Sequence, residues 1–176
     1  AWLFGAGMVA DAFFVAFRIP STLRELLGEG ALSAAFIPAF TRTVTREGRE
    51  AAWRLASKVL GTLVVVLAAV TATGMVLAPW IVQALAPGFG QVAGKLELTV
   101  TLLRIMFPYI FLVGLAALFM ATLNSLGHFL TPALAPMLYN LAIIIAALVS
   151  HDVHYLAWAV VIGAALHLAV QMPDLR

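Results

Sequence analysis

Long apolar stretches, separated by short runs of polar residues, glycine and proline, dominate this chain. Residues 59–85 contain no charged side chain, and residues 105–150 contain no lysine, arginine, aspartate or glutamate. A helix needs about 20 apolar residues to cross a bilayer, so the first stretch is long enough for one span and the second for two. The sequence N-S-L-G-H at 124–128, followed by Pro132, marks the break between those two. The expected spans are residues 1–4 (the end of a helix), 11–40, 59–85, 105–123, 132–149 and 155–171.

Basic residues cluster in one connecting segment, residues 41–58, which holds five of the ten lysines and arginines. Cytoplasmic loops of membrane proteins are enriched in lysine and arginine, so we expect this segment to be a cytoplasmic loop. Residues 86–104 and 150–155 are then expected to lie outside, with residues 90–104 forming an outer loop or a surface helix. The basic run either serves only as this topology signal or also binds lipid headgroups.

The stretch 11–40 differs from the other expected spans because it carries five charges. Asp11, Arg18, Glu25 and Glu29 are spaced seven, seven and four positions apart, so on an ideal helix they lie within roughly 40° of one another. A charge at bilayer depth costs about 2.5–3.5 kcal/mol, and such residues normally face a protein-lined or watery interior. This stripe therefore predicts one wall of a polar cavity.

The fifth charge, Arg24, falls off that stripe on ideal geometry. Pro20 is expected to interrupt the helix, however, and the kink leaves the phase beyond it open. Thirty helical residues measure about 45 Å, more than the roughly 30 Å hydrocarbon core, so some charges must lie beyond the membrane. Glu25 and Glu29 are the first candidates for that alternative and are only possible cavity residues.

Composition places the chain among all-α, polytopic membrane proteins. It is 64% hydrophobic and 10% charged, whereas soluble domains are about 25% charged. The net charge of +2 is too small, and too concentrated in one segment, to favour nucleic acid as a partner. Cysteine is absent, which excludes disulfides, thiolate metal sites and a cysteine nucleophile. The chain does not begin with methionine and stops directly after an apolar span, so we expect it to be part of a longer protein.

The remaining polar residues give weaker signals. His151 and His154 have a spacing seen in some metal sites, but a zinc site needs three or four ligands and no others are near, so we predict no metal. His167 is expected to be a buried hydrogen-bonding group. Asn140 either pairs with a neighbouring helix or lines the cavity. No phosphate-binding loop, zinc-protease motif or serine-hydrolase motif is present, so we predict neither enzyme activity nor a cofactor.

The run D-A-F-F-V-A-F-R-I-P-x-x-L-R-x-L-x-x-E-G-A-x-x-x-A-F-I-P, which begins at Asp11, strongly resembles the MurJ/MviN family of lipid II flippases. Further matches are A-P-W, A-P-G-F, L-L-R-I-M-F-P-Y-I, N-S-L-G-H-F-x-x-P-A-x-A-P, Asn140 and L-A-W-A-V-x-x-G. The resemblance covers the whole chain in order. It implies that residues 1–176 are the amino-terminal lobe of a transporter of the MOP exporter superfamily, from the end of helix 1 through helix 6 of about fourteen.

The same resemblance assigns roles to individual residues. Asp11 matches an acidic position that the family needs for function, Arg18 matches a basic position on the same helix, and Arg24 matches a functionally important arginine of the cavity. Glu25 stands where the family often has a second arginine, so a double-arginine clamp on phosphates is not expected in this chain.

The implied function is translocation of undecaprenyl-linked lipid II from the inner to the outer face of the bacterial plasma membrane by alternating access. The implied partners are the lipid substrate, membrane lipids and a carboxy-terminal lobe. Three alternatives stay open. The first is another exporter of the superfamily, such as an O-antigen flippase or drug antiporter. The second is a membrane-embedded prenyl-pyrophosphate phosphatase, whose acid–base constellation is not found. The third is an inactive scaffold that recruits cell-wall enzymes.

Overall fold

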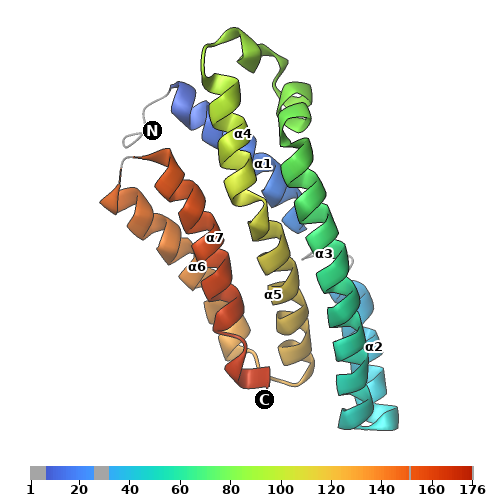
Figure 1. The fold of residues 1–176 in the computed structure, drawn as a ribbon. Coiled ribbons are helices and arrows are strands. Elements are labelled where there is room, and N and C mark those ends of the chain that lie inside the picture. The colour runs from blue at the N-terminus through green and yellow to red at the C-terminus, as the bar shows by residue number, and fades with distance from the viewer. Residues whose placement is uncertain (1–6, 26–31, 151, 176) are drawn as a thin grey trace.

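The computed structural model describes residues 7–25, 32–150 and 152–175, and every regular element within these ranges is a helix (Figure 1). Four helical stretches are long and apolar enough to cross a membrane, namely Arg49–Leu85, Lys95–Ser125, Leu130–Val149 and Val153–Leu175. The chain is therefore an all-α, polytopic membrane protein. Its elements in order are α1 (Met8–Arg24), α2 (Leu32–Glu47), α3 (Arg49–Leu85), η2 (Pro87–Gln91), α4 (Lys95–Met106), α5 (Pro108–Ser125), α6 (Leu130–Val149), α7 (Val153–Ala169) and η3 (Pro173–Leu175).

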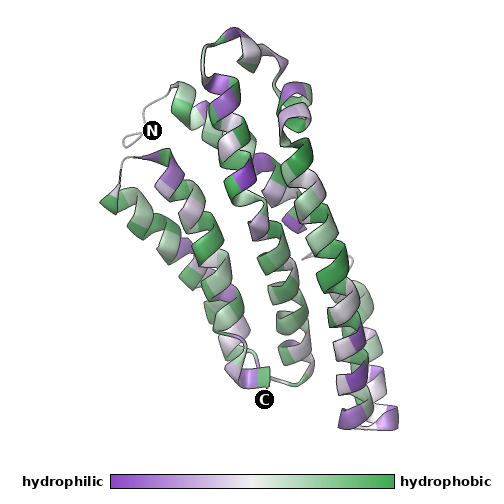
Figure 2. Ribbon diagram, viewed as in Figure 1, coloured by the Kyte–Doolittle hydropathy of each residue, from purple (hydrophilic) through white to green (hydrophobic). Residues whose placement is uncertain are grey.

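The helices run up and down along one common direction (Figure 1). α1 starts at the upper end and α2 reaches the lower end, where the chain turns into α3. α3 returns over the full height and leads into η2. α4 and α5 then descend one after the other, α6 rises again, and α7 descends beside α6. Hydrophilic residues gather at the lower tip of α2 and α3 and at the upper connections, but they also occur along α1 and α4 (Figure 2).

The centre of the bundle is the continuous pair α4–α5. In the most apolar window of Lys95–Ser125, 67% of the residues are buried, against 17% in Arg49–Leu85 and 11% in Leu130–Val149. The large side chains of this pair, among them Leu103, Phe107 and Tyr109, are almost completely enclosed. α6 instead exposes a long apolar surface, including Leu148 and Val149. Such a surface suits contact with lipid chains or with another part of a membrane protein.

The prediction that Pro20 interrupts the first charged helix is wrong. α1 continues as a helix through Pro20 to Arg24, and residues 26–31 lie outside the described ranges. A proline inside a helix removes one backbone hydrogen bond. The loss is tolerated in α1 because the proline and the alanines one and two turns before it are buried, with α1 packed mainly against α4. The helical phase of α1 therefore holds up to Arg24.

The prediction of a loop at residues 41–58 is also wrong, because this segment is helical on both sides of Gly48. α2 ends at Glu47 and α3 begins at Arg49, and Gly48 has φ +87°, a left-handed conformation that favours glycine. The hairpin has its own small core, in which the Phe40 and Trp53 rings meet edge to face with centroids 6.3 Å apart. Apolar side chains on the facing sides of α2 and α3 thus extend both helices beyond the expected span ends.

Residues 95–104, expected in an outer loop or surface helix, form most of the buried helix α4. Thr99, Leu102 and Leu103 are completely enclosed. The segment carries Lys95, Glu97 and Arg104, and charged residues favour exposure to water. Lys95 is largely enclosed and bonds to Asp11, whereas Arg104 stays exposed on α4 and bonds to the Met75 carbonyl of α3. A satisfied charge does not prevent a helix from packing inside the bundle.

A close approach between α3 and the α4–α5 junction depends on Gly74. A Cβ atom at position 74 would lie 2.0 Å from Cε1 of Phe107, so no other residue fits without movement of that ring. Phe107 is 1% exposed and stands directly before Pro108, the first residue of α5. Small residues let membrane helices approach each other closely, and this contact is the tightest example among the described glycines.

We predict that Gly74→Ala lowers the thermal stability of the purified membrane protein. Overpacking of a filled core costs about 1–3 kcal/mol, which outweighs the roughly 1 kcal/mol that alanine gains over glycine in a helix. Gly61→Ala is the matched control on the same helix, because nothing lies within 4 Å of its added Cβ atom. Thermal unfolding in detergent measures both variants. Equal stability of the Gly74→Ala and Gly61→Ala proteins would contradict the packing described here.

Candidate functional site

A cavity of about 150 Å³ lies where the carboxyl end of α1 meets α5, α6 and α7. Arg24 enters it from the last turn of α1, Tyr139 from α6 and His167 from α7. Four of the lining residues come from one face of α5 and follow one another at spacings of four, four and three positions. The complete lining consists of Arg24, Tyr109, Val113, Ala117, Met120, Pro136, Tyr139 and His167.

Aromatic rings fix the position of this cavity by joining three helices. The rings of Phe13 and Phe17 stack along α1, with centroids 5.9 Å apart. Phe17 reaches Tyr109 on α5 at 6.3 Å, and Tyr109 reaches Tyr139 on α6 at 5.7 Å. Aromatic pairs at such distances contribute about 0.5–1.5 kcal/mol each beyond their burial. The row therefore holds the carboxyl half of α1 against the wall that Arg24 faces.

The cavity combines cationic and neutral polar groups. Arg24 supplies a guanidinium, the two tyrosines supply hydroxyls, and His167 supplies an imidazole. The Nε2 atom of His167 is buried and has no hydrogen-bond partner among the described residues. These groups suit an anionic oxygen, because a guanidinium presents several N–H donors in a fork and hydroxyls can donate as well. The volume equals about five water molecules at liquid density, so a phosphate-sized group fits but a large headgroup does not.

Asp11 does not belong to this cavity. It lies thirteen positions before Arg24, which is roughly 20 Å along an α-helix. Its Oδ2 atom accepts a hydrogen bond from Nζ of Lys95 on α4 at 2.8 Å, and the same ammonium lies 4.1 Å from the centroid of the Phe89 ring. The side chain of Lys95 is 12% exposed, whereas that of Asp11 is 60% exposed. The pair thus holds α1 to α4 and leaves part of the carboxylate accessible.

The other predicted site residues lie on exposed surfaces. Arg18 and Glu25 share with Asp11 one exposed face of α1, as the seven-residue spacing requires on an unbroken helix. Arg24 points away from that face into the cavity. Asn140 is exposed on α6, next to the buried Tyr139, so the described helices do not enclose it. Glu29 lies outside the described residues.

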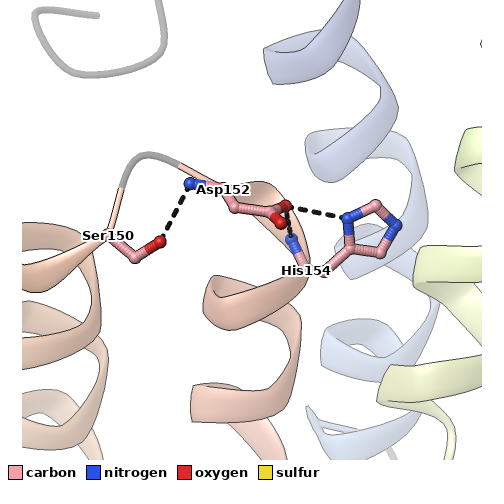
Figure 3. Close-up of polar contacts among 3 residues, drawn as sticks. All are labelled: Ser150, Asp152 and His154. Carbon is pink, nitrogen blue, oxygen red and sulfur yellow. Dashed lines mark hydrogen bonds and ion pairs between the residues drawn. The ribbon is translucent and has the colours of Figure 1, made fainter.

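At the upper end of the bundle, His154 takes part in the hydrogen-bonded start of α7. His151 lies outside the described ranges, and Asp152 is the N-cap of α7, as Figure 3 shows. One Asp152 oxygen accepts bonds from the backbone N–H of His154 at 2.9 Å and from its Nδ1 at 2.8 Å. Both bonds lower the pKa of Asp152, and the bond from the His154 backbone contributes more than the bond from its ring. The described part of the chain contains no group of three or more His, Cys, Asp or Glu residues that could hold a metal ion.

Sequence reasoning missed Lys95, Tyr109 and Tyr139. Lys95 and Asp11 are 84 positions apart, and such a contact leaves no local pattern. The tyrosines stand in apolar spans and resemble ordinary core residues until the helices are packed. One signal was present for Lys95, because no glycine or proline separates it from the apolar stretch that begins at residue 105, so one helix can run through both.

We predict an asymmetric effect when the Asp11–Lys95 pair is broken. Asp11→Asn leaves a mostly buried ammonium with a weaker partner and should destabilise the protein by about 1–3 kcal/mol. Lys95→Met should cost less, because the exposed carboxylate left behind can be solvated and methionine fills the apolar space. Glu50→Gln is the control, since Glu50 pairs with Arg54 at 2.7 Å but is 90% exposed. Thermal unfolding of the three variants is the measurement, and a larger loss for Lys95→Met than for Asp11→Asn would contradict this geometry.

Comparisons with known proteins agree with this arrangement of helices. The family model described as "Lipid II flippase MurJ" matches residues 1–176. The lipid II flippase MurJ of Burkholderia cenocepacia is 40% identical over 98% of this chain and 34% of its own length, and a probable lipid II flippase MurJ of Rhizobium tropici is 38% identical over 94% and 33%. A solved structure of lipid II flippase MurJ in an inward closed conformation superposes with TM-score 0.80 at 26% identity, covering 97% of this chain and 36% of that one. The chain thus spans about a third of the length of these relatives. With the family model matched from end to end, the chain belongs to the lipid II flippase MurJ family.

Proposed function

We propose that this chain is the amino-terminal lobe of a flippase that moves undecaprenyl-linked lipid II from the inner to the outer face of the bacterial plasma membrane. Membership of the family and the share of its relatives' length that the chain covers support this assignment. The second lobe would come from the rest of the protein. The reaction is transport, and no covalent step is required of the residues described here.

The exposed face of α1 supports a cavity between the two lobes. Asp11, Arg18 and Glu25 lie together on this face, and a charged residue on a membrane helix avoids lipid because exposure to hydrocarbon is costly. We assign this face to a water-filled space that the carboxy-terminal lobe closes from the opposite side. Asn140, exposed on α6, is a further candidate for that lining.

The observation that carries the proposal is the position of Arg24. Its guanidinium lies at a cavity large enough for a phosphate group and too small for the sugar–peptide headgroup. Lipid II has a pyrophosphate between its headgroup and its prenyl chain, so the charged group and the bulky group need separate places. Arg24 is proposed to bind phosphate oxygens through its planar fork, while the headgroup occupies the space between the lobes.

Transport would proceed by alternating access. Two lobes that rock against each other can open the shared cavity first to one side of the membrane and then to the other, while the prenyl chain stays in lipid. We place the arginine-rich tip of α2 and α3 on the cytoplasmic side because of its charge. Exclusive labelling of a cysteine at exposed position 46 from the outer side would contradict this orientation.

We predict that Arg24→Ala in the full-length protein abolishes complementation of cells depleted of their native flippase, while protein levels in the membrane stay near normal. Arg24→Lys should restore little, because an ammonium is a point charge and does not reproduce the two-pronged contact with phosphate. The matched control is Arg46→Ala, at an exposed arginine near the tip of α2. Full complementation by Arg24→Ala at normal expression would remove Arg24 from the proposed substrate site.

A further inference from the structure

Two long helical stretches of this chain each contain a proline, and the turns beside these prolines contact each other. Pro79 lies inside α3, and because proline has no N–H, the carbonyl of Met75 one turn earlier cannot receive its normal helical hydrogen bond. Nε of Arg104 on α4 donates a hydrogen bond to this carbonyl oxygen at 3.1 Å. A side chain of one helix thus replaces the missing backbone donor of another.

The second proline, Pro108, lies close by at the junction of α4 and α5. α4 ends at Met106 and α5 begins at Pro108, with Phe107 between them. The Phe107 ring packs against Gly74, the residue directly before Met75. The turn of α3 before Pro79 and the junction of α4 and α5 therefore touch at two adjacent points, one polar and one apolar.

We propose that these two proline sites form one hinge and that Arg104 is its pin, a positioning residue that joins α4 to the open carbonyl of α3 while the helices bend. The upper unit consists of the end of α3, η2, α4 and the start of α1, which Lys95 fastens through its bond to Asp11. The lower unit consists of the long lower part of α3 with α2 and α5. The upper unit can tilt against the lower unit at the two places where a proline has removed a backbone hydrogen bond.

Arginine suits this place for a physical reason. A backbone N–H would fix the Met75 carbonyl at one helical geometry. A long side chain with five N–H donors can follow the carbonyl through a range of bend angles and keep it bonded. An unbonded carbonyl in a membrane protein is costly, so the pin makes bending possible without exposing a bare polar group to lipid.

The first test is a double-mutant cycle in the full-length protein. Arg104→Met should lower the unfolding midpoint by about 1–3 °C, because it leaves the Met75 carbonyl without its donor in a protein about three times as long as this chain. In a Pro79→Ala background the same substitution should cost little, because alanine restores the backbone N–H. Arg54→Met, at an arginine bound only to a carboxylate, is the control and should cost the same in both backgrounds.

An equal loss from Arg104→Met in both backgrounds would overturn the role of the pin. If the Arg104→Met protein does not accumulate, accumulation of the Pro79→Ala/Arg104→Met protein is the expected result, and its failure to accumulate as well overturns the proposal. Neither result depends on the identity of the transported molecule.

The second test measures bending directly by spin labels at cysteine pairs, which this cysteine-free chain permits. The pair 85/129 joins the upper end of α3 to the lower connection before α6, and the pair 65/129 stays within the lower part; all three positions are exposed. Pro79→Ala should narrow the distance distribution of the first pair and leave the second unchanged. It should also slow lipid II transport, a consequence that rests on the function proposed above. Unchanged distributions for both pairs would overturn the hinge, whereas narrowing without slower transport would keep the hinge and separate it from transport.

Discussion

A charge or an unbonded backbone group inside a membrane must find a partner in the protein, and this requirement explains most of the unusual features of the lobe. Lys95 is nearly enclosed because its ammonium donates a hydrogen bond to Asp11 and lies over the Phe89 ring. Arg104 stands within a membrane-spanning stretch and donates to a carbonyl that a proline has left open. Because these cations are satisfied by α1 and α3, α4 can lie in the middle of the bundle and connect both helices.

The same central helices are held by shape as well as by charge. Apolar burial between helices contributes little in lipid, since the chains around them are equally apolar, so close packing and hydrogen bonds carry the association. Gly74 receives the Phe107 ring, Gly114 receives Leu67 and Gly163 receives Tyr139. Two of these contacts involve residues next to the functional features, because Phe107 adjoins the proposed hinge and Tyr139 lines the cavity of Arg24. Packing and site geometry are therefore coupled.

The sequence predicted the helical membrane class and the family, because apolar stretches and the motif from Asp11 onward are local signals. On an ideal helix Arg24 lies off the face shared by Asp11 and Arg18, but the expected kink at Pro20 left its direction open. The expected break at Pro20 was wrong because burial of α1 outweighs one lost hydrogen bond. The bond of Asp11 to Lys95 and the cavity of Arg24 could not be predicted, since they depend on how helices far apart in sequence pack together.

We infer that the charged face of α1 borders water between two lobes. A single cysteine at position 18 of the full-length protein, treated with a water-soluble thiol reagent, tests it most directly. We expect fast labelling at position 18, and added lipid II should slow it. A cysteine at position 65, an exposed apolar site on α3, should stay unlabelled in lipid. Position 18 as unreactive as position 65 would place this face against lipid or protein and would contradict the account.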